Sequence, residues 1–142
     1  MQSLNFNEGY KEFCINNDET RVIRFNPADY GLLERFSQAK KTITKTINEL
    51  KIDPEGESED EIDETAGVLA EVRKLIFDQI NYIFDADVAQ TAFGNQSPIS
   101  TVKGKFLFER FMEAAGPYIE KEIKAEQAAS QRRIEKYTKQ VR

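Results

Sequence analysis

Apolar residues recur at steps of three and four along two long stretches of the chain, and this spacing predicts two amphipathic helices. The first helix is predicted over residues 26–50, where Asn26 offers a capping side chain and Pro27 suits the first helical position. The second is predicted over residues 64–85, with an apolar arc wide enough to contact more than one neighbouring element. The apolar positions are Leu32, Leu33, Phe36, Ala39, Ile43, Ile47 and Leu50 in the first helix, and Leu69, Val72, Ile76, Ile80 and Ile83 in the second.

The first 25 residues have the character of a β-hairpin. Two stretches rich in β-formers, residues 11–15 and 21–25, are separated by the turn-forming residues Asn16-Asn17-Asp18-Glu19. A lone hairpin is only marginally stable in water, so we expect it to pack on the helices. We expect Cys14 to be a small buried side chain in this hairpin. The expected packing residues are Phe13, Ile15, Ile23 and Phe25, and Leu4 and Phe6 suggest a short additional strand.

The remaining segments connect and follow the two long helices. Residues 53–64 carry eight acids and no base, and we predict an exposed acidic loop over residues 51–63. A short helix is predicted over residues 86–94, ended by Gly94 in a left-handed conformation. The last helix is predicted over residues 104–138, where Gly116-Pro117 must kink or restart it, and it ends in a basic tail.

Together these elements predict a single domain over residues 1–142. The fold class is α+β and predominantly helical, with the N-terminal β-hairpin packed on a bundle of three to four helices. Of the 142 residues, 39% are hydrophobic and 32% charged, which is typical of a globular chain. No stretch approaches the roughly 18 apolar residues that a membrane span needs, and no signal peptide begins the chain. We therefore expect a cytoplasmic location and no membrane partner.

The absence of histidine changes the functional picture most. It excludes Ser/His and Cys/His nucleophile pairs and imidazole metal ligands. A single cysteine excludes an internal disulfide. Asp85 and Asp87 resemble an acid–base pair, but nothing near them in sequence would raise a carboxylate pKa. We therefore predict a protein that is not an enzyme, has no cofactor and acts by binding.

The acidic stretch also invites comparison with a calcium-binding loop. Counted from Asp53, carboxylates fall at positions 1, 3, 5, 7, 9 and 12. However, Ser58 stands where the calcium loop needs a glycine, and Asp60 where an apolar residue is expected. A solvated acidic loop is therefore preferred, and no metal site is predicted.

Aromatic residues on the second and last helices are the main candidates for a binding surface. The side chains of four residues cannot all lie on one narrow stripe, so a second face should meet the second helix, another subunit or a client: Phe106, Phe108, Phe111 and Met112. An ordinary core is the alternative. Bases with one aromatic near the chain end suit a solvated C-terminal helix, an acidic partner or a nucleic acid, although the net charge of −5 opposes phosphate binding. The candidate partner-binding residues are Phe77, Tyr82, Phe84, Phe106, Phe108, Phe111, Met112, Arg132, Arg133, Lys136 and Tyr137.

The order of these features resembles a known family. The motifs that carry the resemblance span nearly the whole chain and are compositional and structural, not catalytic. With them the chain resembles the small tail assembly chaperones of long-tailed, siphovirus-type phages and prophages of Gram-positive bacteria. The motifs are Phe25-Asn26-Pro27-Ala28-Asp29 with Arg35-Phe36, Asp78-Gln79-Ile80-Asn81-Tyr82-Ile83-Phe84, Phe93-Gly94, the segment 104–111, and Arg132-Arg133-Ile134-Glu135-Lys136-Tyr137-Thr138.

The resemblance implies a function in phage tail morphogenesis. Such chaperones bind the long helical tape measure protein while tail tube subunits polymerise around it, so the tape measure protein and the tail tube protein are the implied partners. They act in the host bacterial cytoplasm and are absent from the mature virion. Family members are often made in short and frameshift-extended forms. The alternative function, from the residues alone, is a small helical nucleic-acid-binding or regulatory protein, and self-association is compatible with either.

Overall fold

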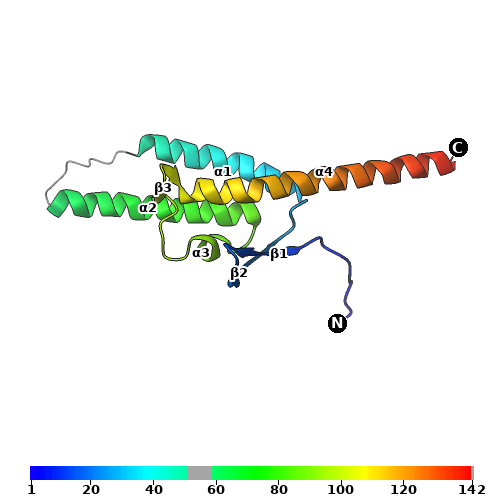
Figure 1. The fold of residues 1–142 in the computed structure, drawn as a ribbon, viewed down its shortest axis with the longest axis horizontal. Helices are drawn as coiled ribbons and strands as arrows, with labels where there is room; N and C mark the ends of the chain where they lie inside the picture. The colour runs from blue at the N-terminus through cyan, green and yellow to red at the C-terminus, as the bar shows by residue number, and fades with distance from the viewer. Residues whose placement is uncertain (51–58, 142) are drawn as a thin grey trace.

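The computed structural model describes residues 1–50 and 59–141, with the side chain of residue 141 excepted. It confirms the predicted class, because an N-terminal two-stranded antiparallel hairpin is followed by a helical majority (Figure 1). The elements are β1 (Lys11–Ile15), β2 (Asp18–Phe25), α1 (Tyr30–Glu49), α2 (Glu59–Phe84), α3 (Ala89–Phe93), β3 (Thr101–Val102), β4 (Lys105–Phe106) and α4 (Leu107–Val141).

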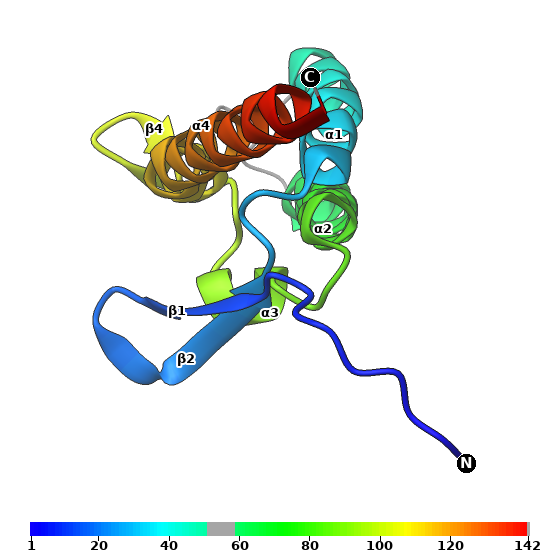
Figure 2. The ribbon, with the colours of Figure 1, turned by 90° about the vertical axis from the view of Figure 1, so that its right-hand side faces the viewer.

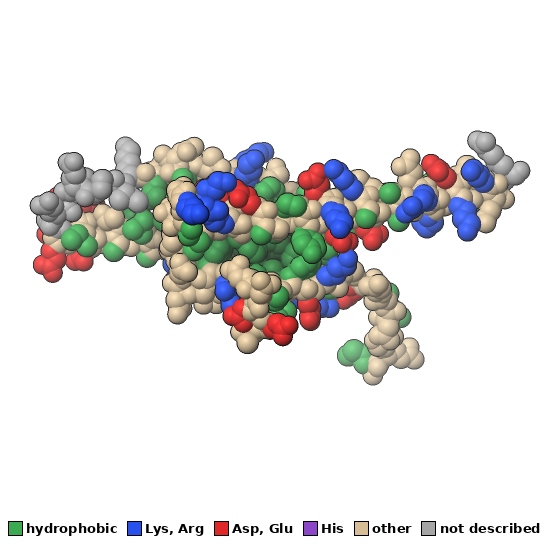
Figure 3. All heavy atoms as spheres, in the orientation of Figure 1, with side chains coloured by type: hydrophobic (Ala, Val, Ile, Leu, Met, Phe, Trp, Pro, Cys, Tyr) green, Lys and Arg blue, Asp and Glu red, His purple; other side chains and the backbone are tan. Residues whose placement is uncertain are grey.

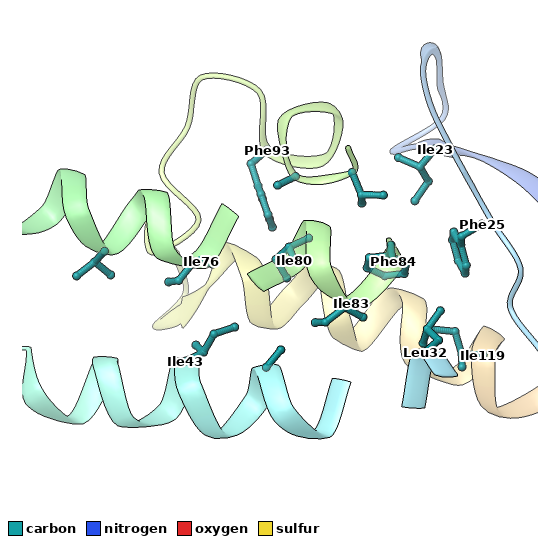
Figure 4. Close-up of a cluster of buried hydrophobic side chains, with 14 of the residues drawn as sticks. Ile23, Phe25, Leu32, Ile43, Ile76, Ile80, Ile83, Phe84, Phe93 and Ile119 are labelled. Atoms are coloured by element: carbon teal, nitrogen blue, oxygen red, sulfur yellow. The ribbon is translucent and has the colours of Figure 1, made fainter. Parts of the chain in front are cut away.

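The core is centred on α2, as its wide apolar arc predicts. Ile76 and Ile80 are fully buried and Ile83 nearly so, with Ile43 of α1 on one side and Phe93 of α3 on the other (Figure 4). Viewed along the long axis, α1 and α2 stack on each other, α4 lies beside them, and the hairpin with α3 lies below α2 and α4 (Figure 2). Burial of a large aliphatic side chain contributes roughly 1.5–3 kcal/mol, so these residues account for much of the stability.

Helix α1 begins three residues later than the sequence pattern predicts. Asn26 does not cap the helix; its side-chain Oδ1 accepts a hydrogen bond from the N–H of Ala28 at 2.9 Å and closes a turn. Pro27 is buried in that turn. The capping residue is Asp29, whose Oδ1 accepts from the N–H of Gly31 at 2.9 Å. Asn26 and Asp29, three residues apart, are both good capping residues. Because Asn26 closes the turn at residues 26–28, Asp29 caps the helix.

Helix α2 begins earlier than predicted. Residues 59–63, expected in the acidic loop, form its first turn and more, with Glu59, Asp60 and Glu61 at its N-terminus. Carboxylates there interact favourably with the helix dipole, and that effect outweighs their mutual repulsion. The loop prediction for residues 51–58 lies outside the described residues.

The hairpin confirms the predicted packing residues. Ile23 and Phe25 are buried, and Phe13 and Ile15 pack against the core cluster. Asn16 and Asn17 both have positive φ, as a tight hairpin turn requires.

Two expectations for the N-terminal segment are wrong. Leu4 and Phe6 belong to no strand and are 91% and 75% exposed. Cys14 is exposed because strand alternation sends its neighbours Phe13 and Ile15 to the packed face.

The segment before α4 contains a second hairpin that the sequence analysis did not predict. Strands β3 and β4 pair across Lys103 and Gly104, which have φ values of 52° and 83°. Helix α4 therefore begins at Leu107 and not at Gly104. It then continues through Pro117 as one helix, so of the two outcomes expected at Gly116-Pro117, a kink or a restart, the restart does not occur.

Three polar side chains connect the ends of these elements to one another. The Arg35 Nε donates to the carbonyl of Ile83 at the end of α2, at 2.9 Å. Arg21 donates to two carbonyl oxygens at the end of α3. The Asn81 Oδ1 accepts from the N–H groups of Val88 and Ala89, both at 2.8 Å, and so satisfies donors at the start of α3.

Candidate functional site

An apolar groove lies between α1 and α4. It consists of two adjoining hollows of about 570 Å³ each, and Phe36 of α1 and Met112 of α4 line both. The first hollow has Ile80 and Ile83 of α2 in its lining, and Phe106 and Phe108 belong to it as well. We call the two hollows together the α1–α4 groove. The second hollow is lined by Leu32, Leu33, Phe36, Met112, Gly116, Pro117, Ile119, Glu120, Ile123, Lys124 and Gln127.

A third apolar hollow lies on the other side of α4, against the hairpin and α3. Its volume is about 450 Å³, and aromatic residues from four elements line it, among them Phe13, Phe93 and Phe111. Figure 3 shows hydrophobic side chains gathered in a hollow below α4. The Arg21 and Arg110 side chains also line this hollow, so its rim is positively charged. We call it the hairpin groove.

The two grooves explain why the first turns of α4 carry large apolar residues on two sides. Phe108 and Met112, four residues apart, line the α1–α4 groove. Leu107 and Phe111, the adjacent pair at the same spacing, line the hairpin groove. Residues four apart share a helix face, so α4 presents two neighbouring apolar stripes to two different openings. The face of α4 that carries Phe108 and Met112 is only partly covered by α1 and α2, and the uncovered part is the α1–α4 groove.

Only some of the predicted partner-binding residues line a groove. Phe106 and Phe108 stack with ring centroids 5.6 Å apart at the α1–α4 groove. Phe84 is a core residue, 5% exposed, and its ring packs on Phe25 and Phe111. Its ring lies on the face of α2 that meets the hairpin and α4, and it is therefore unavailable to a partner.

Two further candidates on α2 also lie outside the grooves. Phe77 is half-buried between Phe93 and the Arg73 guanidinium, which lies 4.7 Å from its ring centroid. The Tyr82 hydroxyl donates to Oε1 of Gln38, and the Tyr82 side chain is otherwise exposed. Both residues help to hold α2 against its neighbours and do not contribute to the groove lining.

The predicted basic residues lie far from both grooves. Arg132, Arg133, Lys136 and Tyr137 are exposed on the distal half of α4, which projects beyond the rest of the molecule (Figure 1). They therefore form a separate surface, joined to the grooves only through the helix itself.

Helix α1 supplies groove residues that sequence reasoning missed. Phe36, Ile47 and Lys40 line the α1–α4 groove, and none was predicted as a partner-binding residue. Phe36 and Ile47 were assigned to the core stripe of α1, which is consistent with their partial burial. The apolar stripe of α1 is wider than the core that covers it, since Leu33 in the same stripe is 46% exposed. Helical spacing alone does not show which members of the stripe are covered.

The charges around the α1–α4 groove are of both signs. Lys40 and Glu109 line its first hollow together with Glu113. Lys105 forms an ion pair with Glu113 at 2.7 Å, and the hydrogen bond from Lys105 lowers the pKa of the Glu113 carboxyl. A mixed rim around an apolar floor is the arrangement expected where an amphipathic helix is to be bound.

A metal ion and a membrane each require a particular arrangement of residues. Within residues 1–50 and 59–141, no group of three or more Cys, Asp or Glu side chains is placed to hold a metal ion. The calcium-loop alternative considered for residues 53–64 lies partly outside the described residues. In the part of the chain that is described, no helix is long and apolar enough to cross a membrane.

Comparison with known proteins gives no relatives. The chain matches no protein-family model, no curated protein and no solved structure.

Proposed function

We propose that this protein is a phage tail assembly chaperone. In this proposal it binds helical segments of the tape measure protein in the host bacterial cytoplasm, helps to recruit tail tube subunits, and is absent from the mature virion. The tape measure protein is proposed as the client because the sequence motifs resemble those of that family. The α1–α4 groove is the observation that carries the proposal, because it is a mainly apolar opening on an otherwise charged helical surface.

The groove suits a helical client for two reasons. Its lining combines flexible Met112 with the aromatic rings of Phe36 and Phe108, and such a surface can pack against many similar apolar faces. It runs along two helices, so a client helix can lie along it with residues at i, i+3, i+4 and i+7 facing inward. The protein then acts by shielding apolar client surface from water and from other clients, and needs no catalytic group.

A direct test is co-expression with helical fragments of a tape measure protein. We expect the protein to co-purify with such a fragment and to keep it in solution. The variant Phe108→Ser/Met112→Ser should lose at least tenfold in affinity, because each serine removes apolar area from the groove lining. The matched control Val22→Ser/Val102→Ser changes two exposed apolar residues outside the α1–α4 groove and should bind normally.

Circular dichroism of each variant separates lost binding from lost folding. Equal affinity of the groove variant and the control would contradict the groove as the client site. Failure of the unmodified protein to bind any helical tape measure fragment would contradict the chaperone proposal itself.

The gene neighbourhood offers an independent test. In a tail morphogenesis cluster the genes that follow should encode an overlapping frame and then a very long tape measure protein. Their absence would contradict the proposal without any protein being made.

The exposed basic end of α4 favours nucleic acid binding as a second candidate function. Titration of labelled duplex DNA at several salt concentrations distinguishes it. A protein that makes several phosphate contacts loses affinity steeply as salt rises. Because the chain has a net charge of −5, we expect no such binding under conditions where a tape measure fragment binds.

A further inference from the structure

Two helices of opposite charge extend past the packed body at opposite ends of the molecule. The first turns of α2 extend beyond the end of α1, and the last turns of α4 extend beyond everything else (Figure 1). Acidic side chains gather at the first end and basic side chains at the second (Figure 3). We call residues 59–68 the α2 overhang and residues 131–140 the α4 overhang.

The α4 overhang continues the buried face of its own helix. Ile119 and Ile123 are buried against the body. Ile134 and Tyr137 lie eleven and fourteen residues after Ile123, which returns them to the same helix face. They are 53% and 67% exposed and do not belong to the core cluster. The apolar face of α4 therefore continues past the body as an uncovered seam. Four bases and one acid flank this seam: Arg132, Arg133, Lys136 and Lys139, with Glu135.

The α2 overhang has the complementary composition. Ile62 lies seven residues before Leu69 and therefore extends the core-facing stripe of α2, yet it is 58% exposed. Residues 59–68 include five acids and no base: Glu59, Asp60, Glu61, Asp63 and Glu64. Each overhang is thus a short apolar seam with charges of one dominant sign around it.

We infer that the α4 overhang of one copy of this chain docks on the α2 overhang of a second copy. Pairing of like overhangs would bring four bases against four, or five acids against five, and Coulomb repulsion disfavours both. The mixed pairing sets bases against acids and covers Ile134 and Tyr137 with Ile62. The occupant is therefore a second copy, in a head-to-tail arrangement.

The positions of the two overhangs limit the assemblies that this contact can form. Because they lie at opposite ends of the long axis, each copy offers one acidic end and one basic end (Figure 1). Two antiparallel copies can form this contact twice and close as a two-fold dimer, whereas copies joined by one contact each continue into open chains or larger rings. Neither overhang lines the α1–α4 groove, so the inference is independent of the proposed client binding.

Sedimentation velocity over a hundredfold range of protein concentration tests the inference. At low salt we expect the mean sedimentation coefficient to rise with concentration. In about 1 M salt, where the Debye length falls to about 3 Å, the rise should largely disappear. A protein that stays monomeric at low salt over the whole range would overturn the inference.

Charge-reversal variants identify the surfaces. Arg132→Glu/Arg133→Glu/Lys136→Glu should remain monomeric at all concentrations tested. The control Lys41→Glu/Lys74→Glu/Lys103→Glu makes the same change in net charge at exposed positions outside both overhangs and should associate like the unmodified protein. Loss of association in the control as well would show an effect of net charge alone and would overturn the assignment.

A mixing experiment separates head-to-tail docking from pairing of like ends. A second variant, Glu59→Lys/Asp60→Lys/Glu64→Lys, should also be monomeric by itself. Mixed with the α4 variant it should associate again, because one partner keeps an intact α4 overhang and the other an intact α2 overhang. No association in the mixture would overturn the inference, provided circular dichroism shows that both variants are folded. Salt-sensitive binding of duplex DNA by the α4 overhang of a monomeric protein would overturn it too.

Discussion

At the scale of single residues, the fold depends on a few polar side chains that satisfy backbone groups at element ends. Asn81 is the clearest example, since its Oδ1 accepts from two N–H groups at the start of α3 while the residue itself belongs to α2. Arg35 does the same for a carbonyl at the end of α2. Buried backbone groups without partners are costly, so these side chains fix how the elements meet.

Replacement of Asn81 by Ala should therefore destabilise the protein. Loss of the acceptor leaves the N–H groups of Val88 and Ala89 without it, and we expect a decrease of about 1–3 kcal/mol in the free energy of unfolding. Urea denaturation followed by circular dichroism measures it. Asn81→Asp keeps an acceptor oxygen and should lose less, and Asn95→Ala, at an exposed loop position, should be close to neutral. A neutral Asn81→Ala would contradict this role.

The hairpin offers a prediction about proton binding. The pKa of the Asp18 carboxyl lies below its usual range, because the hydroxyl and the N–H of Thr20 both donate to it. A folded pKa below the unfolded one stabilises the fold above the unfolded pKa, and this contribution is lost as pH falls through the folded pKa. In Thr20→Val the pKa of Asp18, followed by NMR titration, should rise, whereas Thr20→Ser should keep it low. An unchanged value in Thr20→Val would contradict the assignment.

At the scale of elements, local conformation and helix dipole effects set boundaries that apolar spacing alone does not. The acidic residues 59–63 extend α2, and the hairpin β3–β4 takes Gly104 out of the predicted α4. Two glycines illustrate the difference. A Cβ at Gly67, inside α2, would meet no atom within 4 Å, whereas Gly104 has a φ of +83° in a turn.

Alanine at these two glycines should therefore have opposite effects. Gly67→Ala should raise the free energy of unfolding by about 0.5–1 kcal/mol, because it reduces the backbone entropy lost on folding. Gly104→Ala should lower it by about 1–2 kcal/mol, since an L-residue is strained at positive φ. Thermal and urea denaturation measure both. The same sign for the two variants would contradict the assigned conformations.

At the scale of the whole molecule, α4 has a packed half and a projecting half. Ile119 and Ile123 are buried against the body, while residues 131–140 are exposed throughout. Opening a helix segment without buried apolar contacts costs little, so the projecting half should not contribute to global stability.

Deletion of residues 131–142 should therefore leave the thermal midpoint almost unchanged. Differential scanning calorimetry at low protein concentration and high salt, where self-association is suppressed, measures this. Ile119→Ala is the contrasting variant and should cost about 2–5 kcal/mol, because it opens a cavity in the core. A large fall in the midpoint after the deletion would show that the projecting half packs on the body.

Some groove residues could be predicted from sequence and others could not. Phe108 and Met112 follow from helical spacing, because residues four apart share a helix face. Phe106 does not follow from it, because it belongs to β4 and reaches the same groove by stacking on Phe108. Phe84 shows the limit of the same reasoning. Its aromatic character suggested a partner surface, but its ring packs between Phe25 and Phe111, from elements far away in sequence. Phe36 was assigned to the core for the converse reason, although its stripe is only partly covered.

The sequence by itself determined the class of fold, the identity of the central helix and the packing residues of the first hairpin. These depend on periodicity and local propensity, which act between residues close together in the chain. Apolar spacing did not show where α1 and α2 begin, because capping and charge at the helix ends set those boundaries locally. Only the tertiary structure decided that α4 lies beside α1 with a groove between them, and that two oppositely charged helix ends project from the body. Those features depend on which surfaces pack together. The spacing of apolar residues within one segment does not predict its contacts with segments far away in the sequence.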